Sequence, residues 1–215
     1  MSRDFNGTSQ YGNIASFSLT ASPCTLAAWV KTTSTSGSAK SILAVCGAGF
    51  HYHLIGQSTA LGKWYCASRA GGSEAYAAGT TAPTTSDWVH VCAVFASSTS
   101  RVLYVNGVNE GSSATSVAPT LSNLAIGIRS DGATPSATPS WFTGQIAEAA
   151  VYSAALDAGQ VASLAAGASP TIVAPASLAF YSRLLGEASP EPNLRGTALS
   201  LTASPAKGAS HPRIY

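Results

Sequence analysis

The chain has 215 residues, and only 9% of them are charged, against roughly 25% in an average globular protein. Its formal net charge is +2, and its Lys and Arg residues form no run, so the basic patch typical of nucleic-acid binding is missing. No apolar run reaches the roughly 18 residues of a membrane span, and the N-terminal MSRDFNGTSQYG lacks the apolar core of a signal peptide. We therefore expect no nucleic-acid partner, no membrane insertion and no export signal.

Short apolar segments separated by turn residues predict a series of β-strands, as in an antiparallel sandwich. In the first part of the chain, these strands are expected at 14–19, 25–31, 41–46, 52–56 and 64–69. The stretch at 87–107, DWVHVCAVFASSTSRVLYVNG, then predicts a hairpin whose strands, 88–96 and 101–105, are joined by a Ser/Thr turn. Both faces of the strand at 88–96 are mostly apolar, so we expect this strand inside a packed sheet.

The second half of the chain predicts further strands and one helix. A long loop at 130–140 is rich in Pro, Ser, Thr and Gly, a composition typical of mobile or functional segments. Asp157 as N-cap and Gln160 at the capping-box position predict a helix at 157–166, with Gly167 as its C-cap. The remaining strands are expected at 124–129, 142–152, 178–184 and 198–202.

Four segments occur in an order that is typical of one fold family: 4–11 (DFNGTSQY), 22–32 (SPCTLAAWVKT), the hairpin at 87–107, and 142–164. Over these segments, within residues 4–167, the chain resembles the laminin-G-like branch of the concanavalin A-like lectin/glucanase jelly rolls. The resemblance implies an all-β fold, an antiparallel β-sandwich (jelly roll) with one short helix. It also implies a single domain over 1–215, with a core at 1–167 and a C-terminal extension at 168–215.

The tail at 178–205 looks like the strand pair that usually opens such a domain. We expect it to return beside the N-terminal strand and to complete the sandwich. The segments ASPEPNLRG and ASHPRIY, at 188–196 and 209–215, are similar to the C-termini of jelly-roll proteins encoded among bacteriophage structural genes.

This second similarity implies a non-enzymatic protein of the bacteriophage virion, either a capsid decoration (cement) protein or a tail-associated jelly roll. Such a protein would be located in the virion, form a homo-oligomer, contact the major capsid protein or tail proteins, and adhere to host-surface glycans. The alternative is a free-standing carbohydrate-binding, lectin-like module or adhesin.

Glucanases of this fold use a pair of carboxylates that face each other across the scissile bond. The carboxylates of this chain show no such pattern, because Glu148 lies between two alanines and Glu74 stands alone in a Gly/Ser stretch. Glu187 and Glu191 are separated by Ser-Pro in a loop, which fixes neither of them. We therefore expect no catalytic residues and no enzymatic activity.

Members of the family commonly carry acidic residues that help to bind calcium. In this chain, Ala147 and Asn193 stand at positions where Asp is common. Calcium needs six to eight oxygen ligands, usually with several carboxylates. We therefore expect no metal and no other cofactor, and a calcium site at Asp4, Asn6 or Asp131 is the weaker alternative.

The histidines and cysteines show no metal-ligand spacing. His51 and His53 share one strand face and could share a metal, but hydrogen-bonded histidines are favoured because no acid or cysteine is close in sequence. His90 is expected to be a hydrogen-bonded residue of the core. Buried free thiols are predicted, with one inter-strand disulfide as the alternative, for Cys24, Cys46, Cys66 and Cys92.

A sugar site would need aromatic rings on accessible surfaces. Trp141, Trp64 and Tyr76 are the predicted glycan-binding residues, and Trp141 follows the long loop directly. The alternative for Trp141 is that it covers an edge of the sandwich. Trp29 and Trp88 lie among apolar strand residues and are expected in the core.

Overall fold

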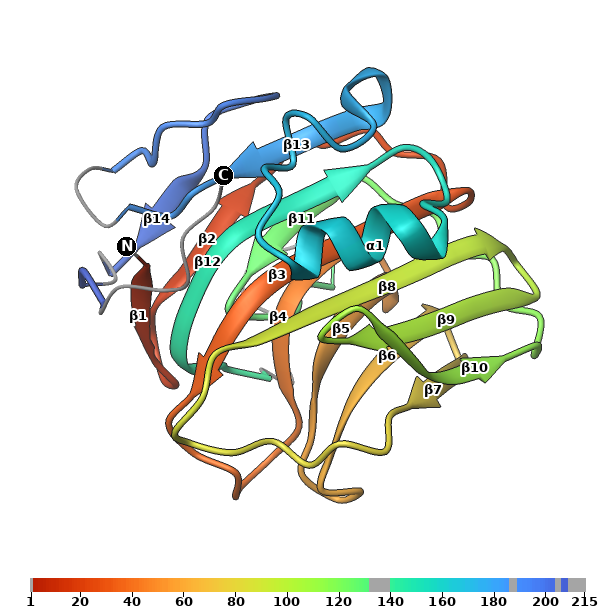
Figure 1. Cartoon of the computed structure of the whole chain (residues 1–215), viewed down its shortest axis with the longest axis horizontal. Helices are drawn as coiled ribbons and strands as arrows, with labels where there is room; N and C mark the ends of the chain where they lie inside the picture. Colours follow the sequence, from red (N-terminus) through yellow and green to blue (C-terminus); the bar gives the residue numbers. More distant parts are fainter. Residues whose placement is uncertain (1, 132–139, 186–188, 204–205, 209–215) are drawn as a thin grey trace.

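The computed structural model describes residues 2–131, 140–185, 189–203 and 206–208, and it shows two antiparallel sheets packed face to face (Figure 1). Sheet A has the strand order β1-β12-β3-β8-β9-β10, with β13 paired to β12 as a further strand. Sheet B has the order β14-β2-β11-β4-β5-β6-β7. The predicted fold class, an all-β sandwich with a concanavalin A-like architecture, is confirmed.

The strands of sheet A are β1 (Arg3–Asn6), β3 (Cys24–Thr32), β8 (Val89–Ser97), β9 (Ser100–Val105), β10 (Val108–Ser113), β12 (Thr143–Tyr152) and β13 (Leu178–Ser182). Those of sheet B are β2 (Tyr11–Ile14), β4 (Lys40–Gly47), β5 (His51–Ser58), β6 (Lys63–Ala70), β7 (Ser73–Ala78), β11 (Asn123–Ile126) and β14 (Ser200–Thr202). The main core lies between the two sheets, where apolar side chains from one face of each sheet meet.

The hairpin at 87–107 forms β8 and β9, and β8 lies between β3 and β9 inside sheet A, as predicted. Val91 and Phe95 of β8 point into the main core. Cys92 and Val94 point to the other side of the sheet, into a second apolar cluster with helix α1. Both faces of this strand are therefore buried, which explains why its sequence is apolar at nearly every position.

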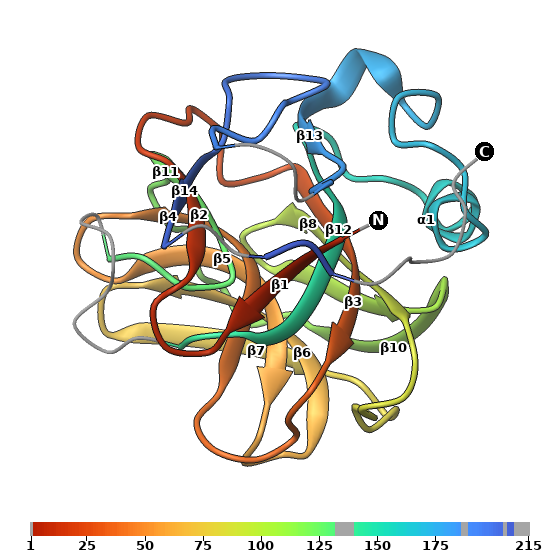
Figure 2. The same cartoon turned by 90° about the vertical axis from the view of Figure 1, so that its left-hand side faces the viewer.

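Helix α1 (Ala158–Ala165) covers the outer face of sheet A (Figures 1 and 2). The predicted capping box is confirmed, because Asp157 Oδ1 accepts a 2.8 Å bond from the Gln160 amide and Gln160 Oε1 accepts one of 3.0 Å from the Asp157 amide. The C-cap is Ala166, and Gly167 follows it with a φ of +96°. In the part of the chain that the structure describes, no helix has the length and apolar character to cross a membrane.

The tail contributes a strand to each sheet. β13 pairs with β12, and β14 pairs with β2 through Leu201 opposite Gly12. The Asp4 amide also donates a 2.8 Å hydrogen bond to the Ala206 carbonyl. The described part of the tail therefore lies beside the N-terminal strands β1 and β2.

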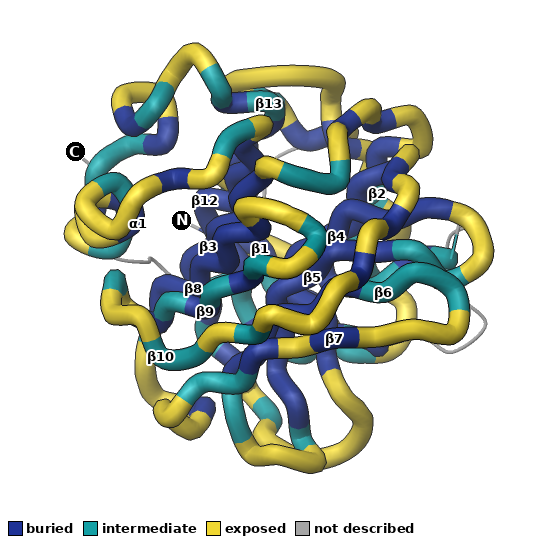
Figure 3. Tube along the Cα trace, turned by 90° about the vertical axis from the view of Figure 1, so that its right-hand side faces the viewer, coloured by how far each residue is buried: buried dark blue, intermediate teal, exposed yellow. Residues whose placement is uncertain are grey.

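One predicted strand was misplaced and three strands were missed. The strand expected at 14–19 ends at Ile14, and β1, β7 and β10 were not expected. β7 and β10 are edge strands, and Figure 3 shows that much of their length is exposed. Because an edge strand with an exposed face needs few apolar residues, SEAYAA and VNEGSS carry little strand signal.

Candidate functional site

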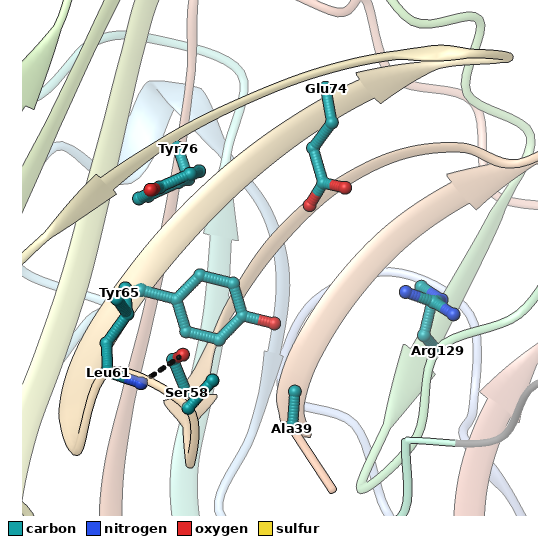
Figure 4. Close-up of a pocket in the computed structure, with 8 residues that line it drawn as sticks. Ala39, Ser58, Leu61, Tyr65, Glu74, Tyr76 and Arg129 are labelled. Carbon is teal, nitrogen blue, oxygen red and sulfur yellow. Dashed lines mark hydrogen bonds between the residues drawn. The ribbon is translucent and has the colours of Figure 1, made fainter.

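The outer face of sheet B carries a pocket of about 410 Å³ (Figure 4). It lies over β5, β6 and β7, beside the residues that follow β11. We call it the sheet B pocket, and its lining consists of Ala39, Ser58, Ala60, Leu61, Tyr65, Glu74, Tyr76 and Arg129.

Strand alternation places the aromatic and acidic side chains in this pocket. On β6, Trp64 and Cys66 point into the main core, so Tyr65 between them points outward. On β7, Ala77 points into the core and Tyr76 therefore points outward, with 53% of its surface exposed. A buried layer of mostly apolar residues lies on the same outer face: Ala44, Cys46, Tyr52, Leu54, Tyr65 and Ala67.

A polar network orients Glu74 and Arg129. The Tyr52 hydroxyl donates a 3.0 Å hydrogen bond to Glu74 Oε1, and Arg69 Nη1 lies 3.3 Å from Glu74 Oε2. Arg129 Nη1 donates to the Tyr52 hydroxyl at 3.4 Å, and its guanidinium lies 5.1 Å from the centre of the Tyr52 ring. Burial, followed by the nearby charge of Glu74, raises the pKa of Tyr52, which keeps its hydroxyl a donor at neutral pH.

The pocket combines two tyrosine rings with a hydrogen-bond acceptor and a cationic donor. Aromatic rings contact the apolar faces of ring-shaped ligands, while groups such as Glu74 and Arg129 bond to polar substituents at the edges. Among the described residues, Glu74 is the single carboxylate that lines the pocket. The arrangement therefore suits the binding of a small polar ring and does not provide a facing pair of carboxylates.

The structure separates the three predicted glycan-binding residues. Tyr76 lines the sheet B pocket. The prediction for Trp64 is corrected, because its indole points into the main core and is 1% exposed. Trp141 lies elsewhere, against a second pocket of about 240 Å³, with its ring 5.9 Å from that of Tyr11.

Sequence reasoning missed most of the site. The Gly/Ser stretch around Glu74 predicts no strand and no binding role for this residue, and no sequence signal near Arg129 indicates a pocket. Most of the predicted loop at 130–140 lies outside the described residues. Of the two tryptophans expected in the core, Trp29 is buried, whereas Trp88, which directly precedes β8, is half-buried.

The histidines are placed mainly as predicted. His53 Nε2 lies 2.6 Å from the Ala21 carbonyl, and His51 Nδ1 accepts a 2.9 Å hydrogen bond from the Thr120 amide. His90 is buried in sheet A, but its Nδ1 has no hydrogen-bond partner within the described ranges, contrary to expectation. Burial lowers the pKa of His90 to about 4, so the ring is neutral at pH 7.

No cluster of three or more His, Cys, Asp or Glu residues that could hold a metal occurs in the described part of the chain. Of the residues considered for calcium, Asn6 uses its Oδ1 to accept hydrogen bonds from three successive backbone amides, at 3.0–3.2 Å. The four cysteines are buried free thiols, as predicted. Burial raises the pKa of each thiol, which keeps them protonated and unreactive.

Residues 6–162 match the family model of the concanavalin A-like lectin/glucanases superfamily. No curated protein sequence matches the chain.

Many solved structures share the fold, among them the following three. A candidate carbohydrate-binding protein from Bacteroides ovatus has a TM-score of 0.69 and 18% identity, over 93% of this chain and 57% of that one. The CBM40 of the Ruminococcus gnavus IT-sialidase, bound to α2,3-sialyllactose, has a TM-score of 0.60 and 16% identity, over 77% of this chain and 98% of that one. Domain 4 of the Geobacillus stearothermophilus arabinanase AbnA, in complex with arabinotriose, has a TM-score of 0.55 and 20% identity, over 76% of each. The chain thus spans little more than half of the Bacteroides protein, and at these identities the likeness establishes the fold alone.

Proposed function

The chain belongs to the concanavalin A-like lectin/glucanase superfamily, and we propose that it is a non-catalytic carbohydrate-binding module. The observation that carries this proposal is the sheet B pocket, which the exposed ring of Tyr76 lines together with Glu74 and Arg129. Fold relatives that were solved with sialyllactose and arabinotriose support the same class of ligand.

The chemistry of the pocket supports a sugar as its ligand. A pyranose or furanose ring has C–H groups that pack on an aromatic face, and Tyr76 offers such a face to solvent. The hydroxyl groups of the sugar need hydrogen-bond donors and acceptors at fixed positions, which the Tyr52–Glu74–Arg129 network supplies. Because neighbouring side chains already hold these groups, little side-chain entropy is lost when a sugar binds.

The same geometry supports binding without hydrolysis. Glycosidases need two carboxyl groups about 5–9.5 Å apart on either side of the bond that they cleave. Glu74 has no such counterpart among the described residues that line the pocket. In addition, Tyr52 and Arg69 both contact Glu74, an arrangement that holds a carboxylate as a fixed acceptor.

The virion function implied by the tail remains a prediction, as do the homo-oligomer and the capsid or tail partners. The proposed module is compatible with that location, because a virion protein can also adhere to host-surface glycans. The lectin-like function is preferred because a pocket of defined residues supports it.

A glycan array followed by isothermal titration tests the proposal. We expect a titratable oligosaccharide hit whose affinity falls about tenfold or more in Tyr76→Ala, since that loss corresponds to about 1.4 kcal/mol, within the range of one lost ring contact. Leu194→Ala is the matched control, because it removes a side chain of similar exposure, 51% against 53%, outside the pocket. The proposal fails if no glycan binds, or if Tyr76→Ala binds as tightly as the unaltered protein.

A further inference from the structure

The second pocket, of about 240 Å³, lies between the turn after β1, the loop between β3 and β4, and the start of β12. We call it the Lys40 pocket. Its lining consists of Gly7, Ser34, Ser36, Gly37, Ser38, Lys40, Trp141 and Thr143. Apart from Trp141 and Lys40, these are glycines and hydroxyl residues, so the wall is small and polar.

Lys40 is a buried cation without a carboxylate partner in the described part of the chain. Its side chain is 5% exposed, and its Nζ donates hydrogen bonds to the backbone carbonyls of Ser34 and Ser36, at 3.2 and 2.5 Å. An ammonium group has three N–H donors, so one donor remains for a further acceptor. Burial lowers the pKa of Lys40, which reflects the cost of holding this charge away from water.

Trp141 is held in place beside this cation. The preceding Ser140 is joined to Ser41 of β4 twice, with 2.6 Å between the two hydroxyl oxygens and 2.9 Å from the Ser41 amide to the Ser140 carbonyl. The Tyr11 ring packs against the indole with 5.9 Å between ring centres. The half-buried indole is therefore a fixed apolar surface at the wall of the pocket.

An anion suits this pocket for two reasons. No acidic side chain lines it within the described residues, and a carboxylate placed at Lys40 Nζ would supply both the third acceptor and the missing charge. The hydroxyl-rich wall and the indole are suited to a sugar ring more than to a bare inorganic ion. We propose that the Lys40 pocket binds a carboxylate-bearing sugar, with its carboxylate at Lys40 and its ring against Trp141.

This inference rests on the proposed carbohydrate-binding function and narrows it to acidic glycans. The two pockets lie close together in the fold. Ala39 lines the sheet B pocket, while its neighbours Ser38 and Lys40 line the other. One segment at the start of β4 therefore separates the two sites.

The test compares acidic sugars with the neutral methyl esters of the same sugars. Trigalacturonate and 3′-sialyllactose are titrated against the folded protein alongside their methyl esters, which keep the sugar and remove the carboxylate charge. We expect at least one acid to bind about tenfold or more tightly than its ester, and added salt to reduce this ratio. Equal affinity of acid and ester in both pairs would overturn the proposal.

Substitutions then assign the preference to a residue. Lys40→Met, which keeps the length of the side chain and removes the charge, is expected to bring the acid-to-ester ratio to about one. Lys63→Met is the matched control, because the Lys63 ammonium also donates to a backbone carbonyl, that of Thr80, but lines neither pocket. A Lys40→Met protein that melts like the unaltered one and keeps the full preference would contradict the proposal.

Two further variants cover the other outcomes. If Lys40→Met fails to fold, Trp141→Ala must weaken binding of the acid about tenfold or more, and unchanged binding would refute the site. Tyr76→Ala separates the two proposals, because the acid preference should survive in it. Binding that depends on Tyr76 without any acid preference would leave the proposed function in place and remove this inference.

Discussion

Arg3 and Glu191 form a buried ion pair across 188 positions of the chain, with 2.6 Å between Arg3 Nη2 and Glu191 Oε2. The two side chains are 3% and 1% exposed. The other carboxylate oxygen of Glu191 accepts a 2.6 Å hydrogen bond from the Leu185 amide. The pair therefore connects β1 to the tail that completes both sheets.

Loss of this pair should destabilise the protein strongly. Glu191→Gln removes the carboxylate charge that lies against the buried Arg3 cation, so we expect the free energy of unfolding to fall by about 3 kcal/mol. Glu74→Gln is the control, because it breaks the more exposed Arg69–Glu74 pair and should cost less than about 1 kcal/mol. Urea unfolding measures both values, and equal losses would contradict a structural role for the Arg3–Glu191 pair.

Stability should also depend on pH through His53 and His90. Burial is the main cause that lowers the pKa of each ring from 6.5 to about 4. Between those pH values the unfolded chain binds protons that the folded protein does not, so the free energy of unfolding falls as the pH drops. Each histidine contributes up to about 1.4 kcal/mol per pH unit in this range.

Urea unfolding at pH 7.5, 6.5, 5.5 and 4.5 checks this dependence. The slope that these two residues add should fade above pH 6.5 and nearly vanish by pH 7.5, and His90→Gln should remove about half of their slope between pH 6.5 and 4.5. A free energy of unfolding that stays constant from pH 6.5 to 4.5 would show that the rings are not buried as described.

Trp64 and Tyr65 should separate stability from binding, because neighbouring residues of β6 point to opposite faces. Trp64→Ala leaves a cavity between the sheets and should cost about 3 kcal/mol or more. Trp64→Phe should retain the affinity for sugar, whereas Tyr65→Ala should lower it. Urea unfolding measures the stability of these variants, and sugar titration measures their affinity. Loss of binding in a folded Trp64→Phe protein would show that Trp64 belongs to the binding site.

The elements that the sequence predicts well are those whose signal lies within one short stretch of consecutive residues. The hairpin at 87–107 carries its own turn, and Asp157 with Gln160 forms a capping box within four residues. In contrast, nothing in the run Trp64-Tyr65 indicates which aromatic faces the core, since both faces of β6 are buried. The edge strand β7 carries two exposed residues of the pocket and too few apolar ones to be recognised.

The candidate site was harder to predict because it is assembled from distant segments. Arg129 reaches Tyr52 from 77 residues away, and Glu74 reaches it from 22. The role proposed for Lys40 depends on its burial and on two backbone carbonyls, neither of which a sequence displays. Pairing between distant strands, rather than any motif, brings these groups together.

The most direct test of the central claim is an NMR titration with the best neutral oligosaccharide from the array. If the sheet B pocket is the binding site, the largest amide shift changes will fall on β6, β7 and the residues around Arg129, and Tyr76→Ala will remove them. Shift changes confined to sheet A or helix α1, or saturable binding without changes on β6 and β7, would contradict the account.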